Sequence, residues 1–481
     1  MSSEEPTATI TAAVTSGYAF DGPVLELGAL MLGPDQVVGS APVRIPLAMV
    51  NRHGLVAGAT GTGKTKTLQL LAEQLSAHGV PVFAADIKGD LSGLAVPGEA
   101  GEKIQARSES VGHGWQATGF PVELFAIGGE GSGVPLRATI SSFGPTLLSK
   151  VLGLNDTQES SLGLVFHYAD QAGLPLLDLA DLRAVVQFLV SDEGKADLKN
   201  LGGLSTSTAG VILRELIAFS DQGADAFFGE PELDTADLIR VAPDGRGVIS
   251  LVELPRLQDR PAVFSTFLMW LLADLFNDLP EVGDIDKPKL VFFFDEAHLL
   301  FKDASKAFLE AIAQTVRLIR SKGVGVFFVT QSPTDVPDDV LAQLGSRVQH
   351  QLRAHTPNDA KALKATVNTY PTSGYADLGE VITSLGIGEA VVTVMSERGA
   401  PTPVAWTLVR APESRMSPAD QEVLDGIVAA SPLQARYAEA LDRDSAHEML
   451  ARKLEAGAAA ADEAPEEASA EAKIRYPKKS A

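Results

Sequence analysis

One glycine-rich stretch holds the residues whose types and spacing best suit chemistry: Gly58-Ala59-Thr60-Gly61-Thr62-Gly63-Lys64-Thr65. It matches GxxxxGK(S/T), the pattern of a phosphate-binding loop, at every fixed position. Glycines let the backbone curl so that several N–H groups point at one anion. Lys64 can then reach the β- and γ-phosphates, and the Thr65 hydroxyl can ligate Mg²⁺. We therefore expect ATP and Mg²⁺ as ligands, with the whole loop and Thr67 contacting the nucleotide.

The neighbouring segments favour this interpretation over a glycine- and threonine-rich turn that matches by chance. Before the loop, His53-Gly54-Leu55-Val56-Ala57 is an apolar run typical of a buried strand. After it, residues 66–75 carry apolar side chains at helical spacing. Strand, loop and helix in this order place the positive end of the helix dipole at the phosphates.

A second chemical landmark is the segment from Lys289 to His298, in which the apolar run Leu290 to Phe294 ends in Asp295 and Glu296. Two adjacent acids at the tip of a buried strand are costly without a metal or phosphate partner. In an ATPase with a phosphate-binding loop, the first carboxylate holds Mg²⁺ through water and the second activates the attacking water as general base. The alternative is an ordinary strand end.

Two further strands end in polar residues. Val324 to Thr330 is followed by Gln331, whose amide can sense the γ-phosphate or the attacking water. The run from Val80 ends in Asp86, with Asp90 close behind. Carboxylates at strand ends lie at the ligand-binding edge of α/β sheets, so these two could approach the metal or nucleotide. They could equally be helix-cap or turn residues.

The elements that carry these residues predict an α/β fold. We expect a RecA-like core with a mostly parallel central sheet flanked by helices, a helical insertion and a disordered C-terminal tail. The expected divisions are a flexible lead-in (1–11), a short β segment packed on the core (12–50), the first part of the core (51–144), the helical insertion (145–245), the second part of the core with a final hairpin (246–415), a helical segment (416–455) and an Ala/Glu-rich tail (456–481).

The composition sets outer limits. The chain of 481 residues has 45% hydrophobic residues, enough for a sizeable core, and no cysteine, which excludes disulfides, thiolate zinc sites and cysteine nucleophiles. A net charge of −23 argues against a protein that coats nucleic acid with its whole surface, although a local basic channel remains open. No apolar run reaches the ~18 residues of a membrane span, and the acidic start lacks the features of a signal peptide. We therefore expect a cytoplasmic protein with no membrane partner.

Taken together, these motifs resemble the HerA/FtsK superfamily of ring-forming ATPases, most of all the stand-alone HerA-like bacterial ATPases of the YjgR type. The similar stretches, within residues 12–415, are Asn51 to Gly54, Asp86 to Asp90, Val291 to Leu300, Arg320 to Gly323 and Thr330 to Pro333. HerA translocases also carry a β-barrel before the core, and FtsK-type proteins a membrane region and a winged helix. We expect none of these modules here.

The resemblance implies a Mg²⁺-dependent ATPase that assembles as a homo-oligomeric ring, with a hexamer expected, and that translocates or unwinds double-stranded DNA. A ring ATPase that remodels protein partners is the alternative, and the negative net charge of the chain favours it. A nucleotide-gated scaffold is a third, although a scaffold has no need of the general base Glu296.

In a ring, an arginine of the neighbouring subunit can complete the site. Arg320 is the first candidate, because it matches the family's arginine turn. Arg347 is the second candidate and Arg317 the third. The alternative for each of them is a surface salt bridge. The segment Asp295 to His298 also spells the DEAH box of another helicase class, but we find one core and interpret His298 as structural.

Overall fold

The structure is a computed structural model that describes residues 4–127, 131–198, 201–253, 261–302, 304 and 306–462. The chain divides into two compact units. The first comprises Met1–Arg137, Gln222–Phe227 and Pro231–Ala440, and the second comprises Ala138–Asp221, Phe228–Glu230 and Leu441–Ala481. The helical unit thus begins earlier than the expected insertion at 145–245, ends earlier, and includes a C-terminal segment that the sequence predicted to be separate.

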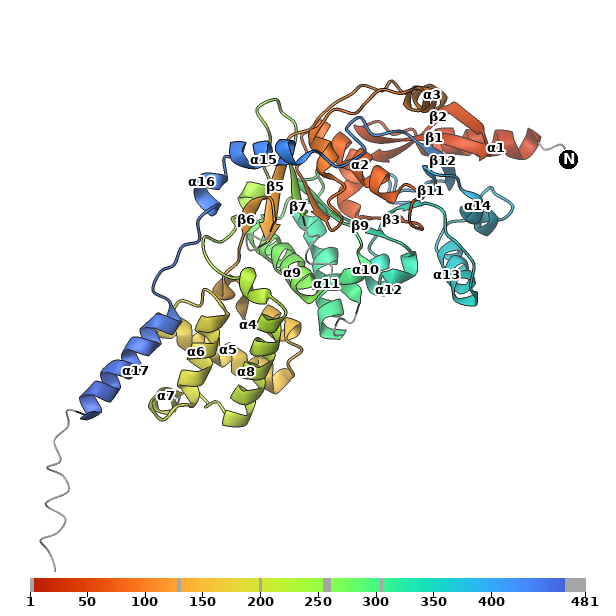
Figure 1. The fold of residues 1–481 in the computed structure, drawn as a ribbon. Coiled ribbons are helices and arrows are strands. Elements are labelled where there is room, and N and C mark those ends of the chain that lie inside the picture. The colour runs from red at the N-terminus through yellow and green to blue at the C-terminus, as the bar shows by residue number, and fades with distance from the viewer. Residues whose placement is uncertain are drawn as a thin grey trace, which may run out of the picture. The chain divides into compact units, whose positions relative to one another are not determined.

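The first unit is built on one sheet, with 12 strands among the described residues, in the order β2-β1-β12-β11-β10-β3-β9-β8-β4-β7-β5-β6 (Figure 1). Its strands are β1 (Val24–Gly33), β2 (Gln36–Pro46), β3 (Gly54–Ala57), β4 (Val82–Asp86), β5 (Val122–Ile127), β6 (Val134–Leu136), β7 (Ile249–Glu253), β8 (Leu290–Phe294), β9 (Val324–Thr330), β10 (Ser346–Gln349), β11 (Glu389–Thr393) and β12 (Ala405–Val409).

From β10 to β6 every neighbouring pair is parallel. The central strands β8 and β9 are buried at every position, because their near-continuous apolar sequences suit a sheet that is covered on both faces. This part of the sheet confirms the predicted α/β class.

Helices cover both faces of the parallel region. Phe83 of β4 packs on Phe267 of α9 (Pro261–Asp278), with ring centroids 6.4 Å apart. Its neighbour Ala84 belongs instead to the buried cluster that contains the apolar residues of α2 (Lys64–Ala77). Successive residues of a strand face opposite sides, so α2 and α9 lie on opposite faces of the sheet. Helices α10 (His298–Phe301) and α11 (Lys306–Ile319) contact α9.

The other end of the sheet is antiparallel, from β10 through β11, β12 and β1 to β2. It contains the predicted final hairpin, β11 and β12, and the two strands expected within residues 12–50. Helices α13 (Pro357–Asn368) and α14 (Leu378–Ser384) pack on it through a second buried cluster.

The N-terminal segment differs from the expected flexible lead-in. Residues 4–11 form most of α1 (Glu4–Gly17), and residues 1–3 lie outside the described part. Val14 is buried, and the buried Tyr18 donates its hydroxyl to the carbonyls of Val392 and Pro403 at 3.1 and 3.0 Å. The partners Val392 and Pro403 are far from Tyr18 in the sequence, so the local composition could not indicate these contacts.

The second unit is helical. It contains α4 (Ile140–Val151), α5 (Asp156–Gln171), α6 (Leu179–Val190), α7 (Asp192–Asp197), α8 (Thr206–Asp221) and α17 (Ala446–Asp462). Helix α17 packs on α6 and continues through residues 456–462, which we expected to belong to the disordered tail. The rest of that tail, 463–481, lies outside the described residues.

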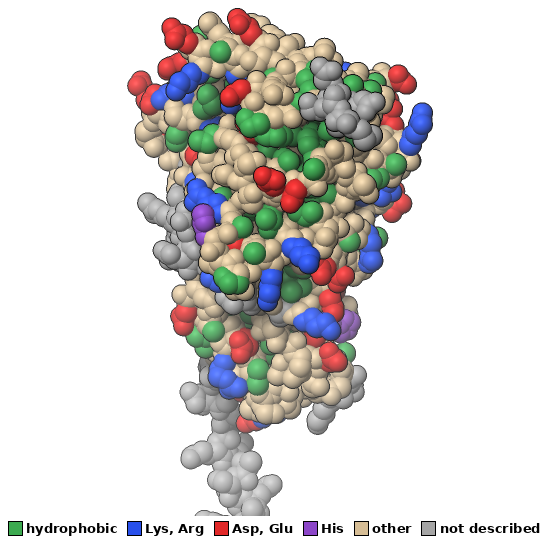
Figure 2. Space-filling model, turned by 90° about the vertical axis from the view of Figure 1, so that its right-hand side faces the viewer, with side chains coloured by type: hydrophobic (Ala, Val, Ile, Leu, Met, Phe, Trp, Pro, Cys, Tyr) green, Lys and Arg blue, Asp and Glu red, His purple; other side chains and the backbone are tan. Residues whose placement is uncertain are grey.

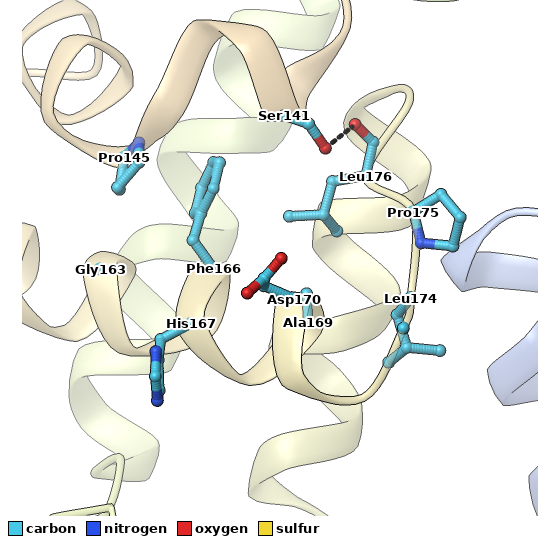
Figure 3. A pocket seen from close by; sticks show the side chains of 11 residues that line it. Ser141, Pro145, Gly163, Phe166, His167, Ala169, Asp170, Leu174, Pro175 and Leu176 are labelled. Carbon is cyan, nitrogen blue, oxygen red and sulfur yellow. Dashed lines mark hydrogen bonds between the residues drawn. The ribbon is translucent and has the colours of Figure 1, made fainter.

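A hollow of about 580 Å³ opens in this unit, lined partly by α4 and α5 (Figure 3). The Ser141 hydroxyl at its rim donates to the carbonyl of Leu176 at 3.0 Å. His167 and Asp170 are exposed at this surface.

The remaining helices of the first unit are α3 (Glu102–Ser110), α12 (Asp338–Leu341), α15 (Gln421–Ala430) and α16 (Gln434–Tyr437). Within the described residues, no helix has the length and hydropathy needed to cross a membrane.

Candidate active site

Three adjacent parallel strands bring the predicted residues to one edge of the sheet. The loop follows β3, Gln331 follows β9, and Asp295 follows β8, in the sheet order β3-β9-β8. The strand ends are level, because Ala57 pairs with Thr330 and Phe294 pairs with Phe328. The loop therefore lies at the same edge of the sheet as the end of β9, which carries Gln331, and the end of β8, which carries Asp295 and Glu296.

The loop backbone needs its glycines. Gly58, Gly61 and Gly63 have positive φ values of 156°, 82° and 118°. A Cβ at Gly58 would lie only 2.5 Å from the Cβ of His350. Gly63 is the N-cap of α2 and makes no side-chain cap, so the N-terminus of this helix is left open to an anion.

Lys64 is the first residue of α2, and its Nζ donates to the carbonyl of Ala59 across the loop at 3.1 Å. Burial lowers the pKa of Lys64, and the carboxylates of Glu296 and Asp295 act in the opposite direction. Electrostatic coupling to these two groups places the lysine near both acids. Thr65 follows it in the first turn of α2 and is partly exposed.

Asp295 is buried, and one of its carboxylate oxygens is unused. Its Oδ1 accepts the backbone N–H of Glu296 at 2.9 Å, whereas the buried Oδ2 has no hydrogen-bond partner. Burial raises the pKa of Asp295 to about 7, and the neighbouring Glu296 acts in the same direction. A buried, unpartnered carboxylate oxygen beside a phosphate-binding loop fits a ligand of Mg²⁺, which prefers oxygen.

Glu296 adopts a left-handed backbone conformation, with φ of 48°, which is uncommon for a residue other than glycine. Its Oε1 bonds Lys88 Nζ, and its Oε2 lies 3.2 Å from His298 Nδ1 without forming a hydrogen bond. Burial raises the pKa of Glu296, but the bond and charge of Lys88 outweigh it, with help from His298 and the Gln331 amide, and hold the pKa below its usual range. Glu296 is therefore ionised, as a general base must be.

Asp86 is a turn residue. Its buried carboxylate accepts four backbone N–H groups, those of Lys88, Gly89, Asp90 and Leu91, at 2.8–3.3 Å. Of the two alternatives left open by the sequence, these bonds favour the turn over a metal or nucleotide ligand. They also fix the backbone that carries Lys88, a residue to which the sequence motifs assign no role.

The buried His350 packs against the phosphate-binding loop and the start of α2. His350 Nε2 lies 2.9 Å from the Thr67 hydroxyl, and its Nδ1 lies 2.8 Å from the carbonyl of Glu389. A carbonyl only accepts, so Nδ1 carries the proton and Nε2 accepts from Thr67. Burial lowers the pKa of His350 to about 4, so the ring is neutral. The Thr67 hydroxyl is thereby bonded within the protein, and a contact of Thr67 with the nucleotide stays a prediction.

The candidate arginine lies away from its own loop. Arg320 begins a short 3₁₀ turn (Arg320–Lys322) ahead of β9, at the edge of the sheet opposite the loop. A strand of this length spans roughly 23 Å at ~3.3 Å per residue. Burial lowers the pKa of Arg320, as does the nearby Arg52, while Asp284 raises it. Arg347 Nη1 lies 3.4 Å from the carbonyl of Thr369, and Arg317 lies on α11.

In the described part of the chain, no three histidine, aspartate or glutamate side chains are grouped to hold a metal. The residues predicted to hold Mg²⁺ are Thr65 and Asp295, and the phosphates of the nucleotide would complete the shell.

A parallel sheet that carries a phosphate-binding loop after one strand and two acids at the end of the next strand but one defines a RecA-like P-loop ATPase. The chain belongs to the HerA-like family: the profile described as "Helicase HerA-like C-terminal" matches residues 34–480. This confirms the superfamily expected from the motifs.

Two similar proteins are named DNA double-strand break repair helicase HerA. The protein from Saccharolobus solfataricus is 20% identical over 386 residues, which are 78% of this chain and 67% of that protein. The protein from Sulfolobus acidocaldarius is 21% identical over 373 residues, which are 77% of this chain and 67% of that protein.

Among solved structures, the unbound bacterial conjugative coupling protein TrwB has a TM-score of 0.53 at 15% identity, covering 85% of this chain and 94% of that chain. TrwB in complex with the ATP analogue ADPNP has the same TM-score and identity, covering 83% of this chain and 100% of that chain. At this identity the likeness confirms the fold alone.

Proposed function

We propose that the protein is a Mg²⁺-dependent ATPase that works as a homo-oligomeric ring, with six subunits expected, and translocates on or unwinds double-stranded DNA. One observation carries the ATPase part of the proposal. The phosphate-binding loop, the unpartnered Asp295 oxygen and the ionised Glu296 belong to one edge of the sheet.

In the proposed reaction, the loop N–H groups and Lys64 bind the phosphates. A water oxygen bonds to the γ-phosphorus as the bond from that phosphorus to ADP breaks, and Glu296 takes the proton of the water. Gln331 orients the water or a γ-phosphate oxygen. Mg²⁺, held through Thr65 and Asp295, would neutralise charge on the phosphate oxygens.

The ring part rests on the position of Arg320. Phosphoryl transfer benefits from a cation on the developing charge of the γ-phosphate. Arg320 lies at the wrong edge of the sheet for its own loop. Head-to-tail contacts that close into a ring would bring the arginine of the next subunit to the loop.

The DNA part rests on the two relatives named as DNA repair helicases. On the face drawn in Figure 2, basic and acidic side chains are interspersed rather than gathered in one basic area. The net charge of −23 favours a second candidate, a ring ATPase that remodels protein partners. The cytoplasmic location stays a prediction.

The ATPase rate, measured with and without double-stranded DNA at two salt concentrations, separates these candidates. A DNA translocase is expected to be stimulated at low salt and much less at high salt, because phosphate contacts release counterions. An ATPase rate that is the same with and without DNA at both salt concentrations would favour protein remodelling. Absence of hydrolysis under every condition would overturn the ATPase itself.

A further inference from the structure

A second lysine reaches the site, and none of the roles above uses it. Lys88 follows β4, and its Nζ bonds the Oε1 atom of Glu296. The Lys88 side chain is 43% exposed and that of Glu296 is 8% exposed. The cation therefore lies nearer to solvent than the buried carboxylate that it holds.

The backbone under Lys88 is rigidly placed. The turn from Asp86 to Leu91 closes around the Asp86 carboxylate, which accepts four backbone N–H groups including that of Lys88 itself. Asp86 is fully buried at the end of a central strand, so its position is set by the sheet. A lysine mounted on such a turn can hold a partner at a defined place.

The two oxygens of Glu296 are not equivalent. Oε1 is bonded to Lys88, whereas Oε2 is buried and makes no hydrogen bond, with His298 Nδ1 3.2 Å away but not aligned. The left-handed backbone of Glu296 is strained and persists only where its surroundings impose it. One oxygen is held by Lys88, whereas the other makes no hydrogen bond and lies beside His298.

We propose that Lys88 is a positioning residue for the general base: it holds Oε1 of Glu296 so that Oε2 is the oxygen that takes the proton of the attacking water. This inference rests on the proposed ATP hydrolysis. A base must be oriented as well as ionised, and a third group that orients the base is a recurrent solution in enzymes. The reverse role, in which Lys88 restrains Glu296 and slows hydrolysis, predicts the opposite sign on removal.

The test removes the Lys88 charge and retains most of its length. Lys88→Met is expected to lower kcat by about 10- to 100-fold, a part of the ~10²–10⁴-fold that a whole acid–base group contributes. The dissociation constant of a fluorescent ATP analogue should change less than about threefold, because the loop and Lys64 are untouched. Lys88→Arg keeps the cation and should restore part of kcat.

Two controls make the result specific. Lys287→Met removes a lysine that donates to the carbonyls of His78 and Gly79, away from the site, and should leave kcat unchanged. In a Glu296→Gln background, Lys88→Met should have little further effect, because residues that act as a unit are not additive.

The outcomes are distinguishable. An unchanged or increased kcat in Lys88→Met, or a raised KM with kcat unchanged, overturns the positioning role while leaving the ATPase intact. So does a full effect of Lys88→Met in the Glu296→Gln background. A wild-type protein without ATP hydrolysis overturns the proposed function and this inference together.

Discussion

At the scale of single residues, the site is closely constrained at Gly58, where the loop leaves β3. Its φ is 156°, and a Cβ added there would lie 2.5 Å from the Cβ of His350, so there is no room for a side chain. Gly58→Ala should lower the free energy of unfolding by roughly 1–3 kcal/mol and weaken nucleotide binding, because the loop or His350 must shift. Denaturant titration and nucleotide titration measure the two effects.

Two glycines are matched controls for this prediction. At Gly61, φ is 82° but nothing lies within 4 Å of a Cβ, so Gly61→Ala reports backbone strain alone. Gly114→Ala, at an exposed position outside the helices and strands, meets neither strain nor contact and should be neutral. If Gly58→Ala behaved like Gly114→Ala, the close support of the loop by His350 would be wrong.

At this scale the sequence indicated the motif residues but missed their supports. Lys64, Asp295 and Glu296 belong to patterns with fixed local spacing. Lys88 lies in the Asp86–Asp90 stretch that resembles the family, but that stretch indicated no role for it, and His350 belongs to no motif. Both residues meet the site only through the pairing of β4 with β8 and of β10 with β3 in the sheet. The hydrogen bond between Thr67 and His350 was not predicted for the same reason, since the two residues are distant in sequence.

At the scale of elements, helix α2 begins at the loop and also anchors a segment that follows β12. Its buried Glu73 accepts the backbone N–H groups of Glu413 and Ser414 at 2.9 and 2.8 Å, together with the Ser414 hydroxyl. Glu73→Ala leaves buried donors without acceptors, at a cost of about 1–3 kcal/mol. Denaturant unfolding should show this loss, whereas Glu422→Ala, at an exposed position of α15, should be neutral. Equal stability of the two variants would contradict the anchoring role.

The elements of the parallel core were predictable because each has a clear period and a clear end. Strands β3, β8 and β9 are apolar runs that end at polar site residues, and α2 begins at the loop. Helix α1 and the extent of the helical unit were not predictable. Their partners, such as α6 for α17, are far away in the sequence.

For the whole molecule, the central prediction is a site shared between subunits. Arg320→Ala should keep ATP binding and assembly but lose most hydrolysis, because the cation on the γ-phosphate would come from the neighbour. Mixing Arg320→Ala with Lys64→Ala protein should restore part of the activity, since some interfaces of mixed rings keep both residues. ATPase assays of the separate and mixed proteins, with particle mass measured in parallel, test this.

Arg452→Ala, at an exposed position of α17, is the control and should hydrolyse ATP normally. Normal hydrolysis by Arg320→Ala, or full activity of the enzyme as a dilute monomer, would contradict the shared site.

The most direct test of the proposed ATPase measures ATP binding and ATP turnover by Glu296→Gln beside the wild-type protein. Glutamine keeps the shape of the side chain but cannot take a proton. We predict that the variant binds ATP normally while turnover falls by roughly 10²–10⁴-fold, and that Lys64→Ala, in contrast, loses binding. Unchanged turnover in Glu296→Gln, or lost binding with turnover per bound nucleotide intact, would contradict the assignment of Glu296 as the general base.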